Sequence, residues 1–162
     1  MIIMGIDPGT AATGYGVVRV EGKNSLEALT YGCIRTSVST PRPVRLKEIF
    51  ESLTALVSQY RPDVIAIEQL FFSKNSKTAL RVGEALGVVL LASACAGVEI
   101  AEYTPLQVKE TLTGFGRAAK DDVREMVILH LGLTKPPRPD DAADGLAIAL
   151  CHHFRSALGG IF

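Results

Sequence analysis

The chain has 162 residues, of which 48% are hydrophobic, and its 17 basic and 17 acidic side chains give a formal net charge of zero. This length favours a single domain over residues 1–162 and is too short for two domains of ordinary size. The balanced charge excludes a protein that holds nucleic acid through an overall basic surface, so a polyanionic partner would need local basic clusters or metal ions.

Three strands are predicted at the start of the chain. Residues 1–7, 14–20 and about 26–36 are apolar stretches, separated by the Gly-rich turn GTAATG and the polar turn EGKNS. This order favours an antiparallel meander. Apolar residues then recur at a spacing of three and four from Leu46 to Tyr60, which predicts a helix that begins near Pro43 and stops before Arg61.

The rest of the chain alternates short strands with helices. VIAIE, residues 64–68, is an apolar run that follows a helix, as a parallel strand in a crossover unit does. Residues 78–97 predict a helix with little polar surface, VEIAEY predicts a short strand, and Thr104-Pro105 predicts the cap and first residue of the next helix. Two further helices are predicted over about 118–131 and 139–157. We therefore expect an α/β fold with a mixed sheet and helices packed on it.

Composition and N-terminal pattern predict a cytoplasmic protein with no membrane segment. No unbroken apolar run approaches the roughly 18 to 20 residues of a membrane span, and the first residues lack the pattern of a signal peptide. Cys33, Cys95 and Cys151 lie far apart and form no CxxC pair, so we expect small core residues and neither disulfides nor a zinc site.

Two of the predicted strands end on an acid, Asp7 and Glu68. An ionised carboxylate beside an apolar core is costly unless a cation, a hydrogen bond or a ligand compensates it. In open α/β sheets, ligands bind outside the carboxyl ends of the parallel strands. Asp7 and Glu68 are therefore candidate site residues.

The last predicted helix adds Asp141 and Asp144, which are three residues apart and project from one face of its start. Helix capping is the simpler explanation for the neighbouring Asp140 but not for Asp144, which lies beyond the best capping positions. Four converging carboxylates would require divalent cations, and hard oxygen ligands favour Mg²⁺ or Mn²⁺ over zinc. Because two such ions about 4 Å apart promote attack on a phosphodiester, the pattern indicates phosphoryl transfer or hydrolysis.

Four motifs, GIDPGTAATGYGVV, AIEQLFFSKN, QVKETLTGFGRAAK and DDAADGLAIAL, together resemble the RuvC family of bacterial Holliday junction resolvases over essentially the whole chain. The resemblance implies a ribonuclease H-like fold with a mixed five-stranded sheet and helices on both faces. It also implies a homodimer that nicks two opposed strands of a four-way DNA junction in homologous recombination and DNA repair. The expected enzyme is a Mg²⁺-dependent endodeoxyribonuclease that leaves 5′-phosphate ends, with two ions per site, Mn²⁺ as a substitute, and the RuvA–RuvB branch-migration complex as partner.

Carried over by motif, the resemblance places the catalytic, metal-binding acids at Asp7, Glu68, Asp141 and Asp144, while Asp140 leaves the choice of one ligand open. It implies that Lys109 and Lys120 lie near the scissile phosphate. The predicted DNA-binding residues are Phe71, Phe72, Lys74, Lys77, Arg81, Lys109, Arg117 and Lys120, with Arg124 as a further phosphate contact. The alternatives are ordinary solvated lysines, and for Phe71 and Phe72 one ring anchored in the core and one exposed ring.

Symmetric cleavage requires two sites related by a two-fold axis, and residues 78–97 are the candidate dimer interface. Three other functions remain open from the sequence. These are a related nuclease acting on structured RNA, a non-catalytic junction-binding module, and an actin-like ATPase domain, because GIDPGT resembles the phosphate-binding hairpin of those ATPases.

Overall fold

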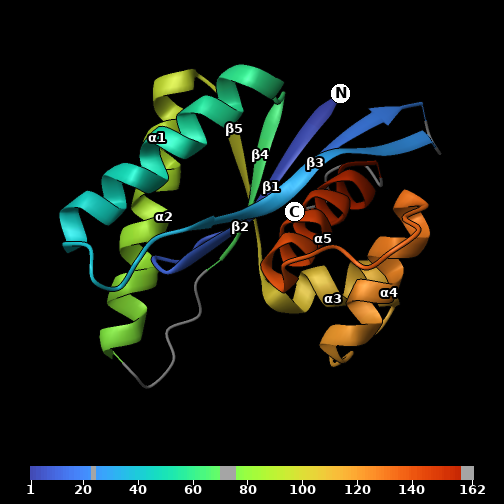
Figure 1. Ribbon diagram of the computed structural model, residues 1–162. Coiled ribbons are helices and arrows are strands. Elements are labelled where there is room, and N and C mark those ends of the chain that lie inside the picture. Colours follow the sequence, from blue (N-terminus) through green and yellow to red (C-terminus); the bar gives the residue numbers. More distant parts are fainter. Residues whose placement is uncertain (23–24, 70–75, 158–162) are drawn as a thin grey trace.

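The structure is a computed structural model that describes residues 1–22, 25–69 and 76–157, with the side chains of residues 76–78 left out (Figure 1). Its strands are β1 (Ile2–Asp7), β2 (Ala12–Glu21), β3 (Ser25–Arg35), β4 (Val64–Glu68) and β5 (Glu99–Tyr103). Its helices are α1 (Arg42–Tyr60), α2 (Ser76–Ala96), α3 (Pro105–Thr113), α4 (Lys120–Leu131) and α5 (Asp140–Ala157). Every predicted element is present, with ends displaced by one or two residues.

The strands form a mixed five-stranded sheet in the order β3-β2-β1-β4-β5. The first three strands are antiparallel neighbours, whereas β1, β4 and β5 run parallel. β2 begins at Ala12, earlier than predicted, because Ala12 and Thr13 still pair with the end of β3. The ribonuclease H-like sheet implied by the sequence is therefore confirmed, with β1 at its centre.

Helices cover both faces of the sheet (Figure 1). α1 and α2 pack on one face, over a core that includes Met4, Ile49 and Ile65. α3, α4 and α5 pack on the other face, over a core that includes Ile3, Val127 and Ile148. α5 contacts β1 and β2 along much of its length. The sheet thus holds the start of α5 against the ends of the central strands.

The outer face of α2 is apolar and exposed. Leu80 is 62% exposed and Leu91 56%, and Cys95 on this helix is exposed as well. The core prediction therefore holds for the buried Cys151 but is wrong for Cys95, because its helix turns one side away from the sheet. Within the described residues, the stretch Ala79–Ala96 is the one helix long and apolar enough to cross a membrane by length and composition, and 22% of it is buried.

Candidate active site

Asp7 and Glu68 end two neighbouring parallel strands. β1 pairs with β4 so that Ile6 lies opposite Ile67, and each strand places its acid at the following residue. Both side chains emerge at the carboxyl edge of the sheet, as the sequence predicts. The hydrogen bonds of the ladder fix the backbone of both acids, so their spacing does not depend on a loop.

Glycines allow α5 to sit directly on β1 and β2. A Cβ added to Gly5 would lie 2.5 Å from the backbone nitrogen of Ala149, and one added to Gly14 would lie 2.7 Å from the carbonyl carbon of Asp141. On the helix side, a Cβ on Gly145 would lie 2.5 Å from the carbonyl carbon of Tyr15. Since side chains at these positions would overlap the facing backbone, the glycines bring the first turns of α5 close to the end of β1.

A cavity of about 250 Å³ is lined by Asp7, Glu68 and Asp144 together with Lys109 and Lys120. Burial, reinforced by the charges of Asp144 and Asp141, raises the pKa of Asp7 to about 6. Burial and then the charge of Asp7 raise the pKa of Glu68 to about 7. These carboxyl groups are therefore costly to ionise without a further cation. This agrees with the sequence analysis, which expected a compensating group beside Asp7 and Glu68.

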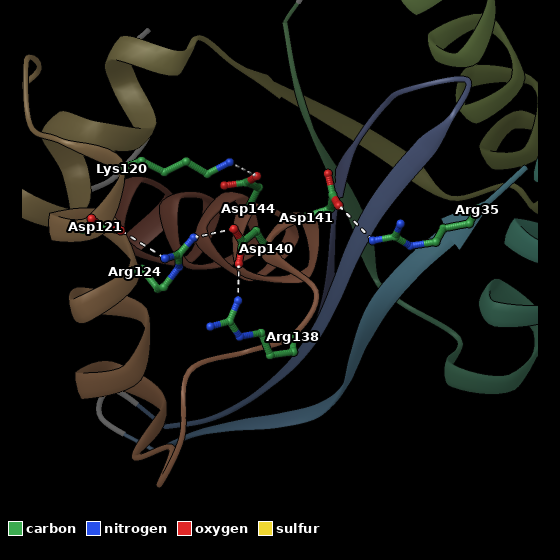
Figure 2. A network of polar contacts seen from close by, with 8 residues as sticks. All are labelled: Arg35, Lys120, Asp121, Arg124, Arg138, Asp140, Asp141 and Asp144. Carbon is green, nitrogen blue, oxygen red and sulfur yellow. Dashed lines mark hydrogen bonds and ion pairs between the residues drawn. The ribbon is translucent and has the colours of Figure 1, made fainter. Parts of the chain in front are cut away.

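Lys120 and Arg35 each hold one of the predicted site acids of α5 (Figure 2). The Lys120 Nζ donates to Asp144 Oδ2 at 2.7 Å, a contact that raises the pKa of Lys120. On the other flank, Arg35 Nη2 lies 3.9 Å from Asp141 Oδ2. Arg35 has no counterpart among the predicted site residues, because its contact joins β3 to a helix more than a hundred residues later. The chain's own cations thus neutralise part of the acidic group.

Asp140 points toward different partners from the other acids (Figure 2). Its carboxylate oxygens lie 3.2 Å from Arg124 Nη2 and 3.2 Å from Arg138 Nη1. Arg124 also pairs with Asp121 at 3.0 Å, and its side chain is 21% exposed. Arg124 therefore joins α4 to the start of α5, which gives it a structural role where the sequence suggested a phosphate contact. Neither Asp140 nor Asp141 is among the residues that line the acidic cavity, but the charge of Asp141 raises the pKa of Asp7.

The donor set fits a hard divalent cation. Across residues 1–22, 25–69 and 76–157, no three Asp, Glu, His or Cys side chains are already grouped as ligands of one ion. However, Asp7, Glu68 and Asp144 line one cavity, and the charge of Asp141 also raises the pKa of Asp7. Carboxylate oxygens suit Mg²⁺ or Mn²⁺. The one neighbouring sulfur among the described residues, the Cys33 thiol, hydrogen-bonds Asp141, and its pKa is raised by burial and by the charge of Asp141. Two of these acids, Asp144 and Asp141, pair with Lys120 and Arg35, so a cation held by the set would compete with those contacts.

The structure describes only some of the other predicted DNA-binding residues. Arg117 is exposed in the turn before α4, and Arg81 is exposed on α2. Phe71, Phe72 and Lys74 lie outside the described residues, and so does the side chain of Lys77. Their roles stay predictions.

The turn that follows Asp7 is pinned by residues that the sequence analysis did not single out. Arg45 donates from Nε to Thr36 Oγ1 at 2.7 Å and from Nη2 to the carbonyl oxygen of Thr10 at 2.9 Å. Thr36 Oγ1 also donates to the Thr10 oxygen, and Thr13 Oγ1 donates to the Gly9 oxygen at 2.7 Å. Arg45 lies on α1 and Thr36 directly after β3, so no local pattern in the sequence could reveal their contacts with Thr10.

The comparisons agree along the whole chain. A family model described as crossover junction endodeoxyribonuclease RuvC matches residues 3–152. The crossover junction endodeoxyribonuclease RuvC of Desulforamulus reducens is 50% identical over 161 residues, covering 99% of this chain and 98% of that protein. The same enzyme of Rubrobacter xylanophilus is 55% identical, covering 94% and 85%. A solved structure of T. thermophilus RuvC in complex with a Holliday junction substrate superposes with a TM-score of 0.93 at 42% identity, covering 98% and 96%.

Proposed function

The chain belongs to the RuvC family of crossover junction endodeoxyribonucleases, and we propose that its acidic cavity is the centre that cuts four-way DNA junctions with Mg²⁺. It is a metal-dependent nuclease that resolves Holliday junctions, in recombination and repair. The observation that carries the site assignment is the meeting of Asp7, Glu68 and Asp144 with two lysines in one cavity. Neither of the other classes, an RNA nuclease or an actin-like ATPase, is favoured by the comparisons.

Asp7, Glu68, Asp141 and Asp144 would hold the metal, with two Mg²⁺ ions per site and Mn²⁺ as a substitute. When bound, the ions would supply Lewis-acid activation of water and stabilisation of the leaving 3′-oxygen, which leaves 5′-phosphate ends. Asp140 stays outside this set because Arg124 and Arg138 hold it.

The lysines of the cavity would position the scissile phosphate. Lys120 lies 2.7 Å from Asp144, beside the proposed metal ligands, where its ammonium group would bind a phosphate oxygen of the substrate. Lys109 lines the same cavity and would bind a second phosphate oxygen. Beyond the cavity, Arg81, Arg117, Lys74 and Lys77 would contact phosphates of the DNA backbone. Phe71, beside Phe72, would stack on an unpaired base at the junction centre.

A homodimer through α2 would place two such sites on opposed strands. The exposed leucines Leu80 and Leu91 and the low burial of Ala79–Ala96 support this face as an interface. We favour a second copy over a membrane as its cover, because Arg81 and Glu84 interrupt the apolar stretch.

Sedimentation of the wild type should give a dimer, and Leu91→Glu should give a monomer; a monomeric wild type at micromolar concentration would refute the interface. Location in the cytoplasm and coupling to RuvA–RuvB are parts of the same proposal.

The test is cleavage of an end-labelled four-way DNA junction beside a linear duplex and an RNA hairpin. Wild type with Mg²⁺ should give paired nicks in the junction alone. EDTA or Asp7→Asn should abolish the nicks, while binding to the junction persists. Binding without cutting under Mg²⁺ or Mn²⁺ would indicate a junction-binding module, and cutting of the RNA hairpin alone would move the proposal to RNA.

A further inference from the structure

A second cavity, of about 310 Å³, is lined by three arginines. It lies between the turn after β1, the start of α1 and the first half of α2. Arg42 and Arg45 come from α1, Arg81 comes from α2, and Glu84 is the acid among them. Thr10, three residues after Asp7, also lines it, so the arginine cavity borders the pinned turn of the acidic site.

The topology places the arginine cavity at the same edge of the molecule as the acids. α1 leads into β4 and α2 leaves it, so both helices begin at the edge where β1 and β4 end (Figure 1). The chain must return through α1 to the opposite edge before β4 can run parallel to β1. A DNA strand held over the acidic cavity would therefore pass close to the arginine cavity.

Positive charge in this cavity exceeds negative charge. Arg42 Nη1 lies 3.4 Å from Glu84 Oε1. Arg45 donates two hydrogen bonds, to the neutral oxygens of Thr36 and Thr10. Among the described residues, neither Arg45 nor Arg81 forms an ion pair. Three guanidinium groups thus face one carboxylate, whose other oxygen has no hydrogen-bond partner among the described residues.

We infer that the arginine cavity binds a backbone phosphate of the junction other than the one that is cut. The inference rests on the proposed function, because it deepens how the same substrate is held. A guanidinium fork matches the geometry of phosphate oxygens, and such contacts fix a protein's position on DNA without reading sequence. Arg45 lines this cavity and also donates hydrogen bonds that hold the turn after Asp7. A phosphate bound to Arg45 would therefore influence the position of that turn.

The test is the salt dependence of junction binding, measured by fluorescence anisotropy in EDTA so that no cleavage occurs. Arg42→Gln and Arg81→Gln should each lower the magnitude of the slope of log K against log[KCl] by about 0.9. Between about 50 and 200 mM salt, each variant should therefore lose about threefold less affinity than the wild type loses. Lys47→Gln is the matched control, because Lys47 lies on α1, 70% exposed and paired with Glu51. It should keep the wild-type slope.

Glu84→Gln supplies a change of the opposite sign. It frees Arg42 from its carboxylate, so binding should tighten, whereas a folding defect would weaken it. Wild-type slopes in both arginine variants, or weaker binding by a Glu84→Gln variant that melts like the wild type, would overturn the inference while leaving the proposed function intact. A wild type that fails to bind the junction at low salt would overturn both.

Discussion

Replacing Gly14 by alanine should distinguish two requirements of the protein: the exact position of the acids, which sets the cleavage rate, and the stability of the fold. The new Cβ would lie 2.7 Å from the carbonyl carbon of Asp141, whereas ordinary contact begins near 3.4 Å. Both groups are backbone, in a sheet and in a helix, so neither can rotate away. The carbonyl oxygen of Asp141 would lie nearer still, so the start of α5 must move from β2 by roughly 1 Å, carrying Asp141 with it.

The expected cost is small for the fold and large for the reaction. Overpacking of this kind costs about 1–3 kcal/mol, and each kcal/mol lowers the melting temperature by about 2–4 °C in a domain of this size. Misplacement of a reacting group by about 1 Å costs on the order of 100-fold in rate. Gly14→Ala should thus fold, bind the junction, and cut it about 100-fold more slowly.

Single-turnover cleavage and thermal melts measure the two effects together. Leu53→Ala is the control, because Leu53 is 1% exposed in the core on the opposite face of the sheet. It should lose about 2–5 kcal/mol of stability yet keep a near wild-type cleavage rate at a temperature where it is folded. A Gly14→Ala variant that cuts at the wild-type rate, or a Leu53→Ala variant that is equally slow, would refute the reasoning.

Three further predictions concern the acids and the pinned turn. Asp140→Asn should cut within a few-fold of wild type, whereas Asp141→Asn should lose more than about 100-fold; equal rates would contradict the ligand assignment. The pKa of Asp7 is raised from 3.8 to about 6 in the folded state, so in EDTA its contribution to stability is complete below about pH 4 and is lost as the pH rises through about 6. Melts in EDTA should therefore show Asp7→Asn gaining on wild type between about pH 4 and 6, with Mg²⁺ stabilising only the wild type; parallel curves would count against it. Thr36→Val removes the hydroxyl that pins Thr10, so the Mg²⁺ concentration for half-maximal cleavage should rise severalfold; Thr54→Val, which loses an exposed bond to Phe50, is the control.

Local patterns were enough to predict the strands, the helices and the acids at the ends of β1 and β4. Strand ends are marked by turns and by a change in polarity, and the spacing of Asp141 and Asp144 is a property of one helix turn. The cap on α3 was also predictable, and Thr104 and Gln107 do form a capping box.

Contacts between distant segments were not predictable in the same way. Gly14 was predicted only as the point where the turn GTAATG meets the strand 14–20, whereas in the fold its missing side chain admits the backbone of α5. Arg35 and Arg45 carried no signal, because their partners lie on elements that only the fold brings near. Arg124 was assigned to phosphate because a charge alone does not reveal that two aspartates already hold it.

The position of α5 in the chain has a consequence for how the protein is made. Asp7 and Glu68 leave the ribosome early, whereas Asp141 and Asp144 arrive on the last helix and reach the sheet only when that helix docks on the glycines of β1 and β2. Domains fold as they are synthesised from the N-terminus, and contacts between distant segments form late. A nascent chain that already has its central strands therefore holds two of the four acids. The capacity to cut DNA begins only when α5 docks on the sheet.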